Sequence, residues 1–151
     1  MDDGAYLDEG PGIVDWVYFE KTRAELGSDF IRILGYYHED GAKSVAQIEA
    51  AMREHNTVAL VIPAHTLKGE SRQFGANVVA EIAEKIENAA RSSVESHSFP
   101  DELIPDVVEL RRLFNMTIEM FDQAVNPLLS RASAAGGGFG KNVANQGFGR
   151  L

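Results

Sequence analysis

The sequence predicts an all-α fold: an antiparallel four-helix bundle with a short additional N-terminal helix and a flexible, glycine-rich C-terminal tail. Three observations favour this fold. Apolar residues recur at spacings of three and four along most of the chain, which is the period of an amphipathic helix. No stretch alternates between apolar and polar residues over the length of a strand. The connections between the expected helices are short, as in antiparallel bundles.

The expected elements follow in order. A short helix is expected around 15–26, ended by Gly27, and Ser28 is a candidate N-cap for the long helix that follows. Thr57 is a candidate cap for the next helix, which stops near Gly75. Pro63 leaves the start of that helix open, because proline removes a hydrogen bond from a helix interior. The apolar series of the four bundle helices are Phe30, Leu34, Tyr37, Gly41, Val45, Ile48 and Met52; Leu60, Ala64, Leu67, Ser71 and Phe74; Val79, Ile82, Ile86 and Ala89 or Ala90; and Leu103, Val107, Leu110, Phe114, Ile118, Phe121, Val125 and Leu128.

The two ends of the chain differ in composition from the middle. Residues 1–12 contain glycine and proline without a helical period, and residues 133–151 hold six glycines and no acidic residue. Ordering so many glycines costs backbone entropy and buries little apolar surface in return. We therefore expect a helical domain over 13–132 between a flexible N-terminus and a flexible tail.

Composition and charge exclude several classes of protein. The chain has no cysteine, which excludes a disulfide scaffold, a cysteine zinc site and a thiol nucleophile. Its 23 acidic and 14 basic residues give a net charge of −9, which repels nucleic acids and anionic membranes, so neither is expected as a partner. With no apolar run of about 18 residues and no signal peptide, the expected location is the cytoplasm.

The spacing of the histidines and carboxylates does not suggest a metal site. None of the four histidines follows a glutamate by three residues or another histidine by four, so the helical spacings of di-iron bundles and zinc proteases are absent. We expect neither a metal nor a cofactor. Three glutamates are interpreted as a solvated helix face: Glu81, Glu84 and Glu87.

His65 is the histidine that the core pattern does not explain. On a helical wheel of about 100° per residue, it points about 140° away from the apolar stripe of its own helix. Gly69 and Arg72 share its outer face, and Lys68 flanks it. Glycine inside a helix costs about 1 kcal/mol relative to alanine. An outward glycine therefore indicates that another molecule approaches the helix closely beside His65.

These residue types suit a phosphoryl group. A neutral imidazole is a good nucleophile, and the neighbouring cations stabilise an incoming anion. Val58, Val61 and Ile62 lie on or near the same outward side, and an apolar cluster outside the core is typical of a docking surface. We predict that these three residues contact the partner.

The run Ala64-His65-Thr66-Leu67-Lys68-Gly69-Glu70-Ser71, followed by Phe74-Gly75-Ala76, resembles the signature of histidine-containing phosphotransfer (HPt) domains. These domains are the four-helix bundles of multistep two-component phosphorelays. The resemblance is strongest over 57–92 and compatible in helix layout from about 15 to 131. It implies that His65 is phosphorylated, that Lys68 stabilises the phosphoryl group and that Gly69 gives the partner access. Glu70 and Pro63 depart from the pattern, since the family usually has a small residue at the position of Glu70.

The resemblance also implies a function. Such a protein is a phosphoryl carrier without its own ATP-binding core, and no glycine-rich nucleotide loop ending in Lys-Ser occurs here. The expected partners are response-regulator receiver domains, which supply the aspartate, the acidic pocket and the magnesium ion, and a sensor kinase. A monomer is expected. Two alternatives stay open: a non-catalytic helical adaptor or kinase-regulating module, and the phosphoacceptor module of a larger sensor kinase.

Overall fold

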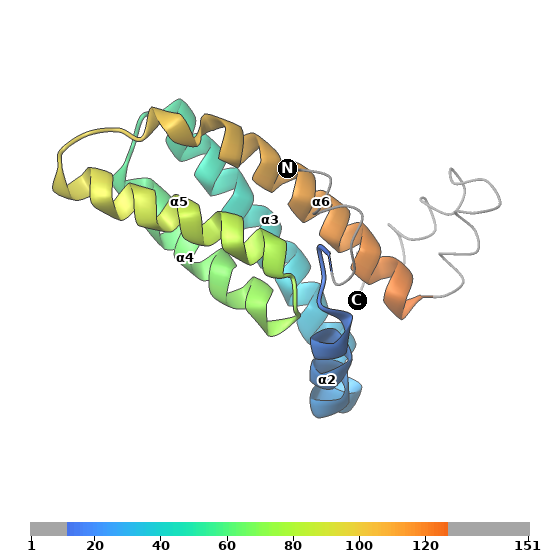
Figure 1. The fold of residues 1–151 in the computed structure, drawn as a ribbon. Coiled ribbons are helices and arrows are strands. Elements are labelled where there is room, and N and C mark those ends of the chain that lie inside the picture. Colours follow the sequence, from blue (N-terminus) through green and yellow to red (C-terminus); the bar gives the residue numbers. More distant parts are fainter. Residues whose placement is uncertain (1–11, 127–151) are drawn as a thin grey trace, which may run out of the picture.

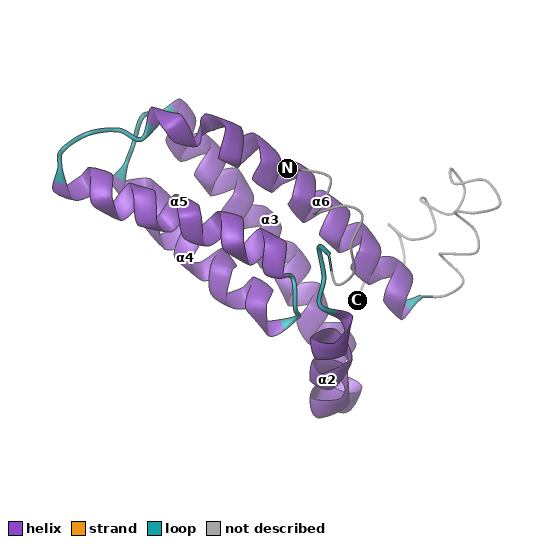
Figure 2. Cartoon of the chain, in the orientation of Figure 1, coloured by secondary structure: helices purple, strands orange, loops and turns teal. Residues whose placement is uncertain are grey.

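The computed structural model describes residues 12–126, and every regular element within that range is helical (Figures 1 and 2). This confirms the predicted all-helical bundle. The tail predicted at 133–151 lies outside the described residues, as do Leu128 and residues 1–11. The elements are α2 (Trp16–Leu26), a 3-10 turn (Gly27–Asp29), α3 (Phe30–Arg53), α4 (Val58–Gln73), α5 (Asn77–Glu95), a second 3-10 turn (Asp101–Leu103) and α6 (Ile104–Val125).

Helices α3 to α6 form the bundle. Helix α4 packs against α3 and α5, and α6 packs against the same two helices from the other side, so α4 and α6 occupy opposite corners (Figure 1). Over residues 12–126, no helix has the length and apolar composition that a membrane crossing requires.

Helix α4 buries one face and leaves the opposite face open. Its buried residues include the four at the bundle-facing positions that the apolar series predicts: Leu60, Ala64, Leu67 and Ser71. The hydroxyl groups of Tyr37 and Ser71 lie 2.7 Å apart in the core, and this hydrogen bond ties α4 to α3. Full burial of each leucine contributes about 1.5–3 kcal/mol to the stability of the fold. Because a rotated helix would expose these side chains, the rotation of α4 about its axis is well determined.

The structure agrees with one of the two predicted cap positions and differs at the other. Helix α3 begins at Phe30, and the turn that precedes it includes Ser28, so Ser28 is not its N-cap. Thr57 makes no capping hydrogen bond; its hydroxyl donates instead to the Ser98 carbonyl at 3.0 Å, and the Asn56 side chain accepts from the first turn of α4. The prediction for Ser28 is wrong, because Asp29 occupies the N-cap position of α3. Thr57 occupies the N-cap position of α4 as predicted, but its side chain makes a tertiary contact in place of the capping hydrogen bond.

The start of α4 is not delayed by its proline. The helix begins at Val58 and runs through Pro63, whose side chain is buried. The proline removes one backbone donor from the helix interior, yet the helix continues to Gln73. His65 is therefore in the middle of a helix and not at its end.

Helix α2 lies against the end of the bundle where α4 terminates (Figure 1). The Asp15 amide donates to the Gly75 carbonyl at 2.8 Å, and the Thr22 hydroxyl donates to the Gln73 carbonyl at 2.9 Å. Gly75 has a φ of +77°, and a Cβ there would lie 2.6 Å from the Asp15 carbonyl oxygen. Glycine at this position thus allows the close approach of α2 to the C-terminal end of α4.

Candidate functional site

The outward face of α4 carries the site residues in a single row. Val58, Ile62, His65, Gly69 and Arg72 follow one another at spacings of four and three along the helix, so their side chains share one face. The side chain of His65 is 57% exposed, as the helical wheel predicts. It lies near the middle of this row.

The imidazole of His65 is bound by a buried carboxylate of the neighbouring helix. Glu87 of α5, whose side chain is 5% exposed, lies with one carboxylate oxygen 3.0 Å from the Nδ1 atom of His65. The Nζ atom of Lys68 is 2.8 Å from the other oxygen, and the Nη2 atom of Arg91 is 2.8 Å from the oxygen that contacts His65. Three charged or polar side chains from two helices therefore meet at Glu87.

The interpretation of Glu87 as part of a solvated face is wrong. Glu81 is exposed and Glu84 is partly exposed. Glu87 is on the buried side of the helix, next to the buried Ile86. The tight packing of α5 on α4 covers it. The sequence contains one local indication that Glu87 has a partner: Arg91 stands four residues after it, and the two side chains form an i,i+4 ion pair.

The ionisation of Glu87 determines the tautomer of His65. Burial alone would raise the pKa of this carboxyl group, but hydrogen bonds from Lys68, Arg91 and His65 outweigh it and lower the pKa to about 2. An ionised carboxylate only accepts hydrogen bonds, so Nδ1 of His65 must carry the proton. In the neutral ring, the lone pair is then on Nε2. The site presents a nucleophilic nitrogen on an exposed side chain.

The two predicted cations have different surroundings. Lys68 is one turn from His65, and its side chain is only 18% exposed because it is held against Glu87. Arg72 lies a further turn along and pairs with Glu84 across α4 and α5, with 2.7 Å between Nη2 and the carboxylate oxygen. The structure thus brings Lys68 into one cluster with His65 and places Arg72 outside that cluster, at the rim.

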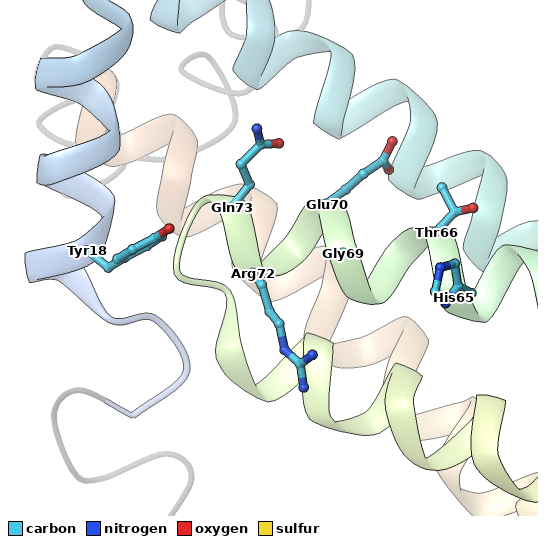
Figure 3. A pocket seen from close by; sticks show the side chains of 7 residues that line it. All are labelled: Tyr18, His65, Thr66, Gly69, Glu70, Arg72 and Gln73. Carbon is cyan, nitrogen blue, oxygen red and sulfur yellow. The ribbon is translucent and has the colours of Figure 1, made fainter.

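Gly69 lies on the floor of an open hollow beside His65. A Cβ atom at Gly69 would have no neighbouring heavy atom within 4 Å. The hollow has a volume of about 530 Å³. Figure 3 shows the seven residues that line it: Tyr18, His65, Thr66, Gly69, Glu70, Arg72 and Gln73.

The predicted apolar patch is only partly exposed. Val58 is 67% exposed and Ile62 is 66% exposed. The prediction that Val61 belongs to this outward patch is wrong, because Val61 is partly buried and packs against the hydrophobic core. It follows the buried Leu60 directly and is therefore on the flank of the helix.

Within residues 12–126, there is no group of three or more histidine and carboxylate side chains that could hold a metal ion. His55 and His97 are in the turns that end α3 and α5, both with positive φ, and His55 stacks on Phe99 with 4.3 Å between ring centroids.

Comparisons with known proteins find a matching family and a similar fold. The family model of the Hpt domain matches residues 32–124. The crystal structure of histidine-containing phosphotransfer protein B (HptB) from Pseudomonas aeruginosa PAO1 is similar with a TM-score of 0.66 and 21% identity, covering 77% of this chain and 96% of that chain. No curated protein sequence matches the chain significantly.

The family match covers more than half of the chain, and it includes the outward histidine and all four helices of the bundle except their outermost residues. The likeness in fold to HptB agrees with it. The chain therefore belongs to the Hpt domain family, whose function is histidine phosphotransfer in phosphorelays.

Proposed function

We propose that His65 is the phosphoacceptor through which this chain relays a phosphoryl group between aspartates of response-regulator receiver domains. The observation that carries this proposal is the hydrogen bond from Nδ1 of His65 to the buried, ionised carboxylate of Glu87. It leaves the Nε2 lone pair free on an exposed side chain, as a nucleophile requires.

The proposed step conserves atoms and charge. The Nε2 lone pair attacks the phosphorus atom of an aspartyl phosphate, the phosphorus–oxygen bond breaks, and its electron pair stays on the aspartate carboxylate. The ring keeps its Nδ1 proton and gains positive charge as the phosphorus–nitrogen bond forms. Glu87, 3.0 Å from Nδ1, stabilises that charge. In the second transfer, the aspartate of another receiver attacks the phosphorus atom, the phosphorus–nitrogen bond breaks, and its electron pair returns to Nε2.

The neighbours of His65 have separate roles in this proposal. Lys68 contributes positive charge one turn along the helix, where the anionic phosphoryl group arrives. Gly69 leaves the approach open, since no atom fills the space where its side chain would be. Arg72 adds charge at the rim, and Val58 and Ile62 form the apolar part of the surface on which the receiver docks.

The same proposal makes the chain a carrier that acts without an ATP site of its own. Phosphate enters from a phosphorylated receiver or from a sensor kinase, and the chain contributes the histidine and the surface around it. One chain supplies all of these residues, so we propose that it works as a monomer, in the cytoplasm where receiver domains are found.

Labelling with a phosphorylated receiver tests this function. A receiver domain labelled on its aspartate should transfer the label to the wild-type protein, giving an acid-labile and base-stable phosphohistidine. His65→Gln should take no label while its circular dichroism spectrum stays unchanged. His97→Gln is the matched control, because it removes an exposed histidine in a turn, and it should be labelled as the wild type is. Label on His65→Gln would refute the assignment, and binding without labelling of the wild type would favour a non-catalytic adaptor.

A further inference from the structure

The charged side chains at the hollow of Figure 3 are not equally compensated. Two cations of α4 have anions of α5 as partners, since Lys68 contacts Glu87 and Arg72 pairs with Glu84. Glu70 also lines the hollow. Its Oε1 atom is shielded from solvent and has no hydrogen-bond partner, and the carboxylate forms no ion pair within the part of the chain that the structure describes. Glu70 is therefore a charged group of the site that lacks a counter-ion.

Glu70 and Arg72 lie on opposite sides of α4. Figure 3 shows the Arg72 side chain directed toward α5 and the Glu70 carboxylate directed toward α3. The 2.7 Å contact with Glu84 holds Arg72 on the α5 side, so this cation does not compensate Glu70. The hollow thus has a wall of paired charges next to α5 and a wall with an unpaired carboxylate next to α3.

The surroundings of Glu70 are unfavourable for a negative charge. Burial and, to a smaller extent, the charge of Asp40 on α3 raise the pKa of Glu70 above its ordinary value of 4.5. A shielded acceptor without a donor destabilises the fold that contains it. A cation at the α3 wall would supply the missing donor and reduce the repulsion between the two carboxylates. The free protein therefore presents a site that a lysine or arginine side chain of a partner would complete.

We infer that Glu70 determines which receivers this chain accepts, by binding a lysine or arginine side chain that the docked receiver places at the α3 wall of the hollow. The inference rests on the proposed function, because transfer to His65 positions the receiver over this hollow. A receiver with a basic residue there gains a charge-assisted hydrogen bond, and one with an acidic residue meets two carboxylates. Glu70 also departs from the family pattern, which usually has a small residue at this position, so the preference belongs to this chain.

Transfer rates across a panel of receivers test this selection. The probes are purified receiver domains, phosphorylated on aspartate, that differ in the charges around that aspartate. For the receiver that labels the wild type fastest, Glu70→Gln should lower kcat/KM by about five-fold, and Glu70→Lys should lower it further. Glu119→Gln and Glu119→Lys are the matched controls, because Glu119 is exposed on α6 at the opposite corner of the bundle, and both should stay within about two-fold. Equal values for the wild type and Glu70→Gln across the panel would overturn the inference.

Charge reversal on both partners identifies the residue that Glu70 binds. Each exposed lysine or arginine around the phosphorylated aspartate of the fastest receiver is replaced by glutamate in turn. One of these receiver variants should transfer slowly to the wild type and faster to Glu70→Lys, because the reversed pair is again of opposite charge. A purely structural role of Glu70 cannot produce such a rescue. If Glu70→Lys rescues none of the receiver variants, the inference is wrong.

Thermal unfolding distinguishes selection from a structural effect. Glu70→Gln should leave the melting temperature unchanged or raise it, because the amide removes the repulsion from Asp40 and a buried charge that lacks a counter-ion. A melting temperature that falls together with the transfer rate, for every receiver in the panel alike, would show that Glu70 supports the fold and would overturn the inference.

Binding without transfer separates this inference from the proposed function. The Kd of the fastest receiver, measured by calorimetry, should be about five-fold higher for the double variant His65→Gln with Glu70→Gln than for His65→Gln alone. If the receiver labels the wild type but the two Kd values agree, the proposed function stands and the role of Glu70 is wrong. If no receiver in the panel labels the wild type, the proposed function fails and this inference fails with it.

Discussion

The Nδ1 atom of His65 lies 3.0 Å from a carboxylate oxygen of Glu87, a residue of the neighbouring helix whose side chain is 5% exposed. Lys68 and Arg91 contact the same carboxylate. One buried anion therefore orients the imidazole and balances two cations at once. Removal of one member of such a group leaves the charges of the others without an opposite charge nearby. Helix α5 is therefore as much a part of the site as α4.

Glu87→Gln should slow phosphotransfer and lower stability. The amide can still accept a hydrogen bond from Nδ1, but it carries no charge to stabilise the ring as the phosphorus–nitrogen bond forms. Single-turnover transfer from a phosphorylated receiver should be slower by about ten-fold, or about 1.4 kcal/mol. The melting temperature should also fall, because Lys68 and Arg91 lose their shared partner.

Nitrogen-15 NMR of the imidazole provides the independent check on this prediction. In the wild type, neutral His65 should be mainly the Nδ1–H tautomer, and in Glu87→Ala the two tautomers should mix. A wild-type spectrum dominated by the Nε2–H form would contradict both the tautomer and the assignment of Nε2 as the nucleophile.

The low pKa of Glu87 predicts a loss of stability in acid. The pKa falls from an ordinary value of 4.5 to about 2 in the folded protein. A carboxyl group with a lowered pKa stabilises the fold above its unfolded pKa, and this contribution disappears as the pH falls from about 4.5 through 2. Thermal unfolding at pH 5 and pH 2.5 should show a larger drop for the wild type than for Glu87→Gln. Equal drops would mean that Glu87 is not ionised in the fold over this range.

How far the sequence predicts the structure depends on whether a feature belongs to one helix or to two. The apolar period predicted the buried stripe of α4 and the outward direction of His65, because both follow from the repeat of a single helix. The burial of Glu87 depends on how α5 is rotated against α4, which no single period specifies. The flanking position of Val61 and the tertiary hydrogen bond of Thr57 could not be predicted for the same reason.

Gly69→Ala should leave the fold intact and slow transfer. A Cβ at this position has no heavy atom within 4 Å, and alanine favours the helix over glycine by about 1 kcal/mol. The melting temperature should therefore stay the same or rise. The added methyl group projects into the hollow beside His65, where it hinders the approach of the receiver. Transfer rates equal to those of the wild type would show that the glycine is not needed for access.

Gly41→Ala is the opposite case and serves as a control for the effect of glycine replacement in a helix. A Cβ at Gly41 would lie 2.5 Å from Cε1 and 2.7 Å from Cζ of the buried Phe114 ring. Overpacking of this kind costs about 1–3 kcal/mol, which exceeds the gain in helix propensity. The free energy of unfolding, measured with urea, should fall, while the folded fraction should still accept phosphate at the normal rate.

Ile62→Asp should weaken binding of the receiver without destabilising the fold, and Val108→Asp is its matched control. The two residues are 66% and 65% exposed, and each is the fifth residue of its helix, α4 or α6. An aspartate therefore meets the same helix environment at both positions, and neither substitution removes a core contact, so both melting temperatures should stay near that of the wild type.

The helices are at opposite corners of the bundle, and only Ile62 shares its face with His65. A charge at 62 should reduce receiver affinity by about ten-fold, or about 1.4 kcal/mol, while a charge at 108 should have no effect. Equal loss of affinity in both variants would indicate a general effect of negative charge, and a large drop in the melting temperature of Ile62→Asp alone would mean that Ile62 supports the bundle instead of docking the partner.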